Sequence, residues 1–364
     1  MDHQGRLKRL RTDLATHRLD ALLVTHLPNI RYLSGFTGSS AALVVTNRVA
    51  VLFTDGRYRT QAKSEIKGAK AAIVPLAPVV AAGEWLRSNQ SKFARGRRTL
   101  GIEGEHLSVS EQARLRQALS STFRPKTALP LVEQMRMVKD QSELSTMCSA
   151  ADLGASLFDV TLRAIEPGLP EVEVAAAMEF EARRRGADAM SFETIIASGP
   201  RSSLPHGRAS QQRLPRNGFV VCDFGVILRG YCSDRTRTVH VGRASRAARA
   251  FYSAVLEAQL AAIDAVRPGV TCDEVDHAAR KLLKRSKLAQ YFTHSTGHGV
   301  GIEIHEPPRV AAQQQKVLEP GMVITIEPGA YLPGQWGVRI EDMVVVTETG
   351  CQILAPGPKE LIEI

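Results

Sequence analysis

The sequence has few of the features of a secreted, disulfide-bonded or membrane-spanning protein. It contains only five cysteines, an odd number, and no two of them form a Cys-x-x-Cys pair. This usage is typical of a chain that folds in a thiol-reducing compartment. No apolar run approaches the roughly 18 residues of a membrane-spanning helix. The polar opening residues also lack the apolar core of a signal peptide, so we expect a cytoplasmic protein.

Aromatic residues are scarce as well, at 5% of the chain, although the formal net charge is +10. An excess of basic residues permits attraction to nucleic acid. The basic clusters are short, however, and carry no interleaved aromatic residues that could stack on bases. We therefore expect neither a nucleic-acid partner nor a membrane partner. With 44% hydrophobic and 23% charged residues the chain is that of a globular protein, and its 364 residues favour two domains.

The first 130 residues alternate between helical and strand-like patterns. Helices are expected near 5–18, 57–66 and 110–119, and strands at 21–24, 41–45 and 49–53. Ser108 or Ser110 is expected to cap the helix at 110–119. Prolines at 125 and 130 then break the alternation. This pattern predicts an α/β domain over residues 1–130 and a second domain over residues 131–364.

The second domain contains an internal repeat after a long helix that we expect Ser142 to cap. Residues 165–168 (Ile-Glu-Pro-Gly) precede Glu173 and a helical pattern, and residues 266–269 (Val-Arg-Pro-Gly) precede Glu274 and a similar pattern. In each copy Pro-Gly predicts a turn and the acidic residue predicts the start of a helix. Strand-like runs follow at 219–224, 237–241, 323–327 and 339–346. The repeat predicts two related halves, each with helices on one side of an antiparallel sheet.

Four carboxylates of this domain lie in apolar, strand-like surroundings, where a buried charge costs several kcal/mol unless something pairs with it. They are Asp223, Asp234, Glu327 and Glu341. Gly230 and Tyr231 allow a turn that would bring Asp223 and Asp234 side by side on adjacent strands, and His298 stands among three glycines. Any one of these residues alone is more often structural. Together they are explained most simply by a pair of divalent metal ions.

The composition of this ligand set favours one metal over others. One imidazole and four carboxylates form an oxygen-rich set, which suits Mn²⁺, although Zn²⁺, Co²⁺ and Fe²⁺ remain compatible with it. Two such ions about 3.5–4 Å apart hold a bridging hydroxide at neutral pH.

These five residues, in this order and with these spacings, resemble the ligands of the pita-bread metallopeptidases, which include methionine aminopeptidase, aminopeptidase P and prolidase. The run at 29–39 (NIRYLSGFTGS) is similar to a stretch common in bacterial members of the last two groups. The resemblance thus covers nearly the whole chain. It implies a mixed α/β (α+β) fold, with a creatinase-like accessory domain over 1–130 and a pita-bread catalytic domain over 131–364.

The resemblance also implies a role for each ligand. Asp223 would chelate one metal ion, His298 and Glu327 would hold the other, and Asp234 and Glu341 would bridge both. Glu327 would act in addition as the general base that takes the proton from the attacking water.

Further residues match the substrate side of the proline-specific branch. His305 would stabilise the tetrahedral intermediate or the leaving nitrogen, and His206 would be a second substrate-side histidine. His294 would line the pocket that accepts proline, with Tyr331 near it, and Arg339 would orient a ligand carboxylate.

The activity implied is hydrolysis of the bond between an N-terminal residue and a following proline, a tertiary amide that calls for a dedicated pocket. We expect an Xaa-Pro aminopeptidase (aminopeptidase P), with an Xaa-Pro dipeptidase (prolidase), which must block the C-terminal side, as the alternative. A non-catalytic nucleic-acid- or protein-binding relative, or a metal-free creatinase-like hydrolase, should lack the complete ligand set. The family's accessory domains commonly cover a neighbour's active site, which implies a homodimer.

Overall fold

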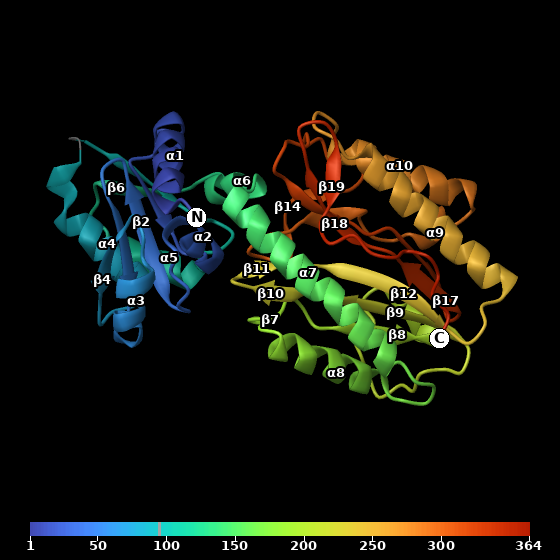
Figure 1. Ribbon diagram of the computed structural model, residues 1–364. Coiled ribbons are helices and arrows are strands. Elements are labelled where there is room, and N and C mark those ends of the chain that lie inside the picture. The colour runs from blue at the N-terminus through green and yellow to red at the C-terminus, as the bar shows by residue number, and fades with distance from the viewer. Residues whose placement is uncertain (94–95) are drawn as a thin grey trace. The chain divides into compact units, whose positions relative to one another are not determined.

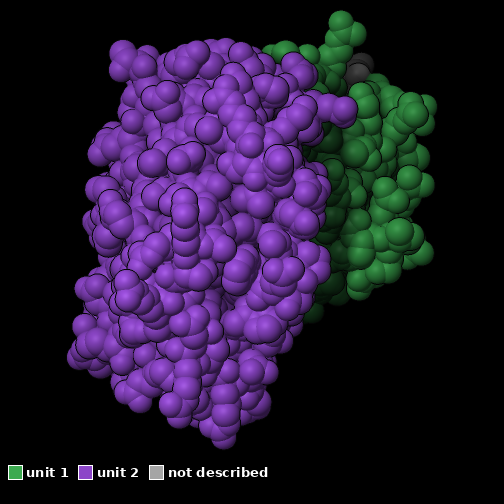
Figure 2. All heavy atoms as spheres, turned by 90° about the vertical axis from the view of Figure 1, so that its right-hand side faces the viewer, with its two compact units in different colours: residues 1–136 green, residues 137–364 purple. Residues whose placement is uncertain are grey.

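The computed structural model describes residues 1–93 and 96–364. The chain forms two compact units, Met1–Arg136 and Met137–Ile364, which Figure 2 colours separately. None of the helices in the described part of the chain is both long and apolar enough to cross a membrane.

The first unit is built on one six-stranded sheet, of which Figure 1 labels β2, β4 and β6. The strand order is β4-β3-β2-β1-β5-β6. Its strands are β1 (Ala21–Val24), β2 (Ala41–Thr46), β3 (Ala50–Thr54), β4 (Lys70–Ile73), β5 (Arg98–Ile102) and β6 (Phe123–Thr127). Its helices are α1 (His3–Thr16), α2 (Leu27–Ser34), α3 (Arg59–Glu65), α4 (Pro78–Ser88), α5 (Val109–Ala118) and the short η1 (Gly56–Tyr58) and η2 (Gln90–Lys92). Every residue of the first three strands is buried, which explains why they read as continuous apolar runs.

The predicted helix at 110–119 is confirmed as α5, and the structure decides which serine caps it. Ser108 accepts a hydrogen bond from the backbone N–H of Glu111, whose side chain binds back to the Ser108 N–H. Two otherwise unsatisfied donors are satisfied by this reciprocal capping box. Ser110, the other candidate, lies inside the first turn of the helix.

After α6 (Leu131–Met137) the second unit has four main helices and thirteen strands among the described residues. The helices are α7 (Gln141–Ala164), α8 (Glu171–Arg184), α9 (Arg246–Ala265) and α10 (Cys272–Arg285), with the short η3 (Gly199–Ser203) and η4 (Ala289–Tyr291). The first-half strands are β7 (Ala189–Met190), β8 (Ile195–Ser198), β9 (Gly218–Phe224), β10 (Val226–Leu228), β11 (Tyr231–Cys232) and β12 (Arg235–Val241). The second-half strands are β13 (Gly297–Gly299), β14 (Glu306–Val310), β15 (Val323–Ile326), β16 (Gly329–Leu332), β17 (Trp336–Arg339), β18 (Asp342–Val346) and β19 (Cys351–Ile353).

The internal repeat corresponds to two structural halves. Helices α7 and α8 pack together in the first half, and α9 and α10 pack together in the second, with the strands between the two pairs (Figure 1). Gly168 and Gly269 precede α8 and α10, and both have φ = 89°. Glycine occupies this left-handed region without the steric cost of a Cβ atom, so the two Pro-Gly turns are equivalent in conformation as well as in sequence.

The long helix α7 begins slightly earlier than Ser142 predicted. Its N-cap is Asp140, whose side chain accepts hydrogen bonds from the N–H groups of Ser142 and Glu143. Glu143 returns a bond to the Asp140 N–H and completes a capping box. Ser142 is therefore the second residue of the helix, and the cap prediction was wrong because a carboxylate two residues earlier outcompetes it for the free N–H groups.

Strand pairing brings the predicted ligand segments together. β9 lies between β8 and β12 in one antiparallel sheet, with Thr236 opposite Asp223. The second sheet has the order β14-β13-β15-β18-β19. The run at 339–346, predicted as one strand, is divided in the structure: β17 ends at Arg339, β18 begins at Asp342, and Glu341 lies between them. Glu327 and Asp234 likewise stand just outside β15 and β12.

Candidate metal centre

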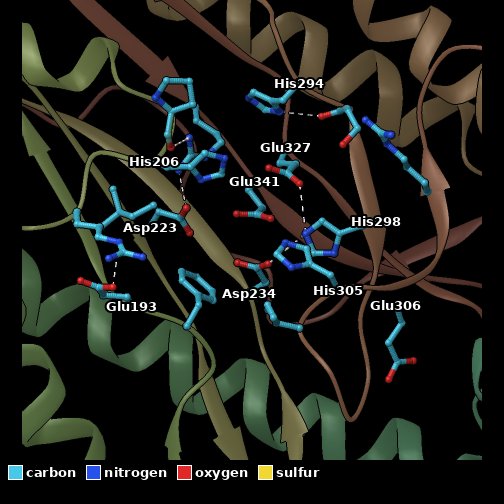
Figure 3. A pocket seen from close by; sticks show the side chains of 18 of the residues that line it. Glu193, His206, Asp223, Asp234, His294, His298, His305, Glu306, Glu327 and Glu341 are labelled. Atoms are coloured by element: carbon cyan, nitrogen blue, oxygen red, sulfur yellow. Dashed lines mark hydrogen bonds and ion pairs between the residues drawn. The ribbon is translucent and has the colours of Figure 1, made fainter. Parts of the chain in front are cut away.

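A cavity of about 850 Å³ opens in the second unit, and the predicted site residues converge on it (Figure 3). Nine of the ten line its wall: His206, Asp223, Asp234, His294, His298, His305, Glu327, Arg339 and Glu341. The tenth, Tyr331, lies behind the wall and is only 5% exposed.

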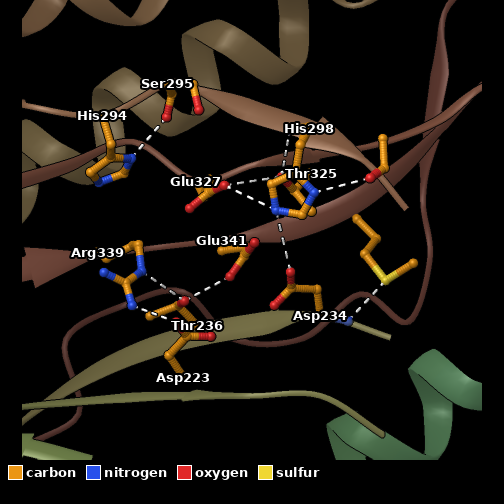
Figure 4. Close-up of polar contacts among 12 residues, drawn as sticks. Asp223, Asp234, Thr236, His294, Ser295, His298, Thr325, Glu327, Arg339 and Glu341 are labelled. Atoms are coloured by element: carbon orange, nitrogen blue, oxygen red, sulfur yellow. Dashed lines mark hydrogen bonds and ion pairs between the residues drawn. The ribbon is translucent and has the colours of Figure 1, made fainter. Parts of the chain in front are cut away.

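Glu341 is held in place by the neighbouring strand β12. Its backbone N–H donates to the carbonyl of Thr236 at 3.1 Å, and its Oε2 accepts from the Thr236 hydroxyl at 2.6 Å. Thr236 also accepts from Nε of Arg339 at 3.1 Å (Figure 4). Thr236 was not predicted as a site residue. Its position two residues after Asp234 was the available signal, because alternate residues of a strand share one face.

His298 presents one ring nitrogen to the acidic residues. Its Nε2 lies 3.6 Å from Oδ2 of Asp234 and 3.4 Å from Oε1 of Glu327 (Figure 4). Its Nδ1 lies 3.0 Å from the carbonyl of Gly299, which can only accept, so the proton is on Nδ1 and Nε2 carries the lone pair. Burial lowers the pKa of His298 to about 4, which favours this neutral form. The imidazole is thus oriented as a metal ligand is.

The carboxylates repel one another in a buried space. Burial raises the pKa of Glu327 to about 8, with the charge of Asp223 adding to the rise. Burial also raises the pKa of Asp234 and of Glu341 well above the ordinary range, and neighbouring carboxylates push both further. Arg339 offsets only part of this charge. Bound protons or cations are therefore needed to balance the negative charge of this cluster at neutral pH.

The chemistry of the donors fits divalent metal ions. One ligand atom each from Asp234, His298 and Glu341 can be chosen so that all lie within 4.8 Å of one another. Asp223 adds a buried Oδ1 with no hydrogen-bond partner among the described residues, while its Oδ2 accepts from Nη2 of Arg339. A buried carboxylate oxygen without a hydrogen-bond partner is costly unless it binds a cation. Oxygen atoms with one imidazole are a suitable set for such ions.

A hydrogen-bonded chain joins this cluster to the predicted proline pocket. Arg339 binds Asp223 and also donates from Nη1 to the Tyr331 hydroxyl at 2.7 Å. Tyr331 lies 2.9 Å from Nε2 of His294, and Nδ1 of His294 lies 2.8 Å from the carbonyl of Ser295. Because that carbonyl only accepts, Nδ1 is protonated and Tyr331 donates to Nε2. Tyr331 thus acts behind the cavity wall by fixing the ring of His294.

The two remaining histidines are exposed to the cavity. The ring of His305 packs edge-to-face against that of His298, with ring centroids 4.3 Å apart. His206 lies in the segment before β9 and also lines the cavity. Burial and the nearby charge of His206 lower the pKa of His305. Both rings are therefore accessible to a molecule in the cavity.

Three exposed charged residues of the cavity wall were not anticipated from the sequence. Glu193 and Arg208 form an ion pair on it, and Arg309 lies on β14. Their residue types and spacings carried no signal, since exposed Glu and Arg are common on any surface. Only the folding of separate segments around one cavity identifies them.

Buried carboxylates and an imidazole at one cavity, flanked by accessible histidines, define the site of a metal-dependent hydrolase. Comparison with protein families agrees: residues 145–348 match metallopeptidase family M24, and residues 6–138 match the creatinase/prolidase N-terminal domain. The chain belongs to metallopeptidase family M24 and carries the creatinase/prolidase N-terminal domain. The predicted family and fold class are thereby confirmed.

Similar proteins span the whole length of the chain. It is 36% identical over 358 residues to a protein of Pyrococcus furiosus named Xaa-Pro dipeptidase, covering 98% of this chain and 99% of that protein. The structure of an Xaa-Pro dipeptidase from Bacillus anthracis superposes with a TM-score of 0.94 at 37% identity and full coverage of both chains. The X-Pro aminopeptidase from Thermotoga maritima has a TM-score of 0.89 at 34% identity, covering 99% of this chain and 100% of that chain.

Proposed function

We propose that this protein is an Xaa-Pro dipeptidase, which hydrolyses dipeptides whose second residue is proline. The names of the similar proteins from Pyrococcus furiosus and Bacillus anthracis support this activity over the aminopeptidase that the sequence led us to expect. One feature of the cavity itself carries the preference for dipeptides.

That feature is an arginine available to bind a carboxylate. Of the three arginines on the cavity wall, Arg339 pairs with Asp223 inside the cluster. Arg208 lies with Glu193, which Figure 3 shows on the Asp223 side of the cavity, away from His294. Arg309 is exposed, and the described residues give it no ion-pair partner. In a dipeptide the proline carries a free carboxylate, whereas in a longer peptide that group is an amide. A free guanidinium facing the cavity favours the former, because it binds carboxylates through charge-assisted hydrogen bonds.

The metal ions would be held by the five predicted ligands. Asp223 would bind one ion, His298 and Glu327 the other, and Asp234 and Glu341 both; Mn²⁺ suits the oxygen-rich set best. When bound, such ions supply an acidified water and polarise the scissile carbonyl.

The chain's own residues supply the proton transfers and orientation. Glu327 accepts the proton of the attacking water on a carboxylate oxygen. His305 and His206, both exposed to the cavity, donate hydrogen bonds to the carbonyl oxygen as its charge develops and to the leaving nitrogen. Arg339 and Tyr331 hold His294 at the wall against which the proline ring packs.

An Xaa-Pro aminopeptidase is the second candidate, favoured by the similarity to the Thermotoga maritima enzyme. It would use the same cluster on longer peptides. The two candidates differ in whether the group after proline is a carboxylate or an amide.

A panel of substrates distinguishes them. After treatment with chelator and restoration of Mn²⁺, the protein is expected to cleave Leu-Pro and to leave Leu-Pro-Ala and Met-Ala nearly intact. Chelator alone should abolish cleavage, because arginine side chains and buried carboxylates cannot lower the pKa of a water molecule as a divalent metal ion does. Cleavage of the tripeptide at a rate comparable to the dipeptide would favour the aminopeptidase. Cleavage of neither proline peptide with Mn²⁺, Zn²⁺, Co²⁺ or Fe²⁺ would exclude both.

Replacing Arg309 is expected to weaken binding of the dipeptide selectively. Arg309→Met should raise KM for Leu-Pro roughly tenfold, the size expected for a lost charge-assisted hydrogen bond at a partly exposed site, with a smaller change in kcat. Arg309→Lys should recover part of the loss. Steady-state kinetics on Leu-Pro amide, which lacks the carboxylate, provide the control: the variant and the parent should process it equally poorly. An equal loss on both substrates would contradict the assignment.

A further inference from the structure

A charged pair occupies one side of the cavity and takes no part in the cluster. Nε of Arg208 lies 2.9 Å from Oε2 of Glu193, and the two side chains are 70% and 59% exposed. Both residues line the cavity. The pair therefore presents one negative and one positive group to whatever enters.

The backbone under this pair is firmly anchored. The carbonyl of Arg208 accepts a hydrogen bond of 2.6 Å from Arg201, which is paired in turn with the fully buried Glu171 at 3.1 Å. Glu193 stands two residues before Ile195, which is the direct strand partner of Asp223. The two exposed side chains thus extend from backbone segments held by strand pairing and by Arg201, close to the first predicted ligand.

The pair lies at the end of the cavity away from the proline pocket. Figure 3 shows Glu193 on the Asp223 side, with the carboxylate cluster between it and His294. If the proline lies against His294, as the proposed function requires, the side chain of the preceding residue points toward the opposite end. That end is bounded by Glu193 and Arg208.

We propose that Glu193 and Arg208 select the first residue of the substrate by its charge; this inference rests on the proposed function. Glu193 receives the side chain of lysine or arginine, and Arg208 receives that of aspartate or glutamate. An ion pair this exposed contributes little by itself, so a charged substrate can replace either partner at low cost. Because both signs are present, the parent protein accepts basic and acidic first residues, and neither is strongly preferred.

Kinetics on three dipeptides test the proposal. The Mn²⁺-loaded protein and its variants are assayed on Lys-Pro, Glu-Pro and Leu-Pro, and kcat/KM for each charged dipeptide is divided by that for Leu-Pro. Dividing by the Leu-Pro value cancels any loss of activity that a variant shows on all three substrates. In Glu193→Gln the Lys-Pro ratio should fall and the Glu-Pro ratio should rise, each roughly threefold to tenfold. Arg208→Gln should shift both ratios in the opposite direction.

Three controls separate charge selection from a structural role. The double variant Glu193→Gln with Arg208→Gln should bring the two ratios back toward each other, and high salt should shrink every shift by screening. Glu319→Gln removes an acid of similar exposure, 53%, that pairs with Lys316 away from the cavity wall; it should leave both ratios unchanged.

The outcomes that overturn the inference differ from those that overturn the function. Cleavage of Leu-Pro with ratios that do not move, or move alike in both single variants, overturns charge selection and leaves the dipeptidase intact. Failure of the parent protein to cleave any Xaa-Pro dipeptide overturns both proposals.

Discussion

Glu327→Gln is expected to lower kcat on Leu-Pro by roughly 10²–10⁴-fold, the contribution of a positioned general base. Glutamine has nearly the same shape and keeps one oxygen toward the cluster, but it cannot accept the proton of the attacking water. Burial raises the pKa of Glu327 to about 8, so the group is largely protonated in the apoprotein at neutral pH, and a neutral amide of the same shape replaces it at little cost. The variant should therefore fold at least as well as the parent.

Stopped assays with Mn²⁺, together with thermal melts of the chelated proteins, measure both effects. Glu319→Gln, the same substitution on an exposed acid, is the matched control and should retain full activity. If Glu327→Gln kept more than about a tenth of the parental kcat, well above the range expected for loss of a general base, another group would have to accept the proton.

Addition of Mn²⁺ to the chelated protein is expected to raise Tm by roughly 5–10 °C. A ligand that binds only the folded state stabilises it by about 2.7 kcal/mol at a concentration 100 times its Kd. A gain of that size shifts the melting of a domain as large as the second unit by several degrees. The physical cause is the cluster of buried carboxylates. Burial and then repulsion between neighbouring carboxylates raise the pKa values of Asp234 and Glu341, and Oδ1 of Asp223 has no hydrogen-bond partner among the described residues.

Glu341→Gln tests whether the metal binds at this cluster. It removes one charge yet keeps an oxygen that can still accept from Thr236, so the apoprotein should melt no lower than the parent. The Mn²⁺-dependent rise should be largely lost. Calorimetric melts of both proteins with and without Mn²⁺ measure this, and an undiminished rise in the variant would place the metal elsewhere. Repeating the titration with Zn²⁺, Co²⁺ and Fe²⁺ ranks the metals.

Local sequence patterns predicted six of the ten α-helices among the described residues and the strands β1, β2, β3, β9, β12 and β15, because turn and cap chemistry act within a few residues. The equal φ of 89° at Gly168 and Gly269 confirms a repeat that Pro-Gly spacing alone had indicated. The errors have equally local causes. Asp140 caps α7 in place of Ser142, and apolar residues on both sides of Glu341 concealed the break between β17 and β18.

By itself, the sequence determined the family and brought five candidate ligands and five substrate-side residues to attention. Carboxylates within apolar runs are conspicuous in a sequence, because burying a charge costs free energy unless another group or an ion pairs with it. Only the tertiary structure connected Arg339 through Tyr331 to His294 and placed Thr236 under Glu341. It also brought Glu193, Arg208 and Arg309 to one cavity. These exposed charges lie far apart in the chain and look ordinary there, because their function depends on the space they share and not on their neighbours in sequence.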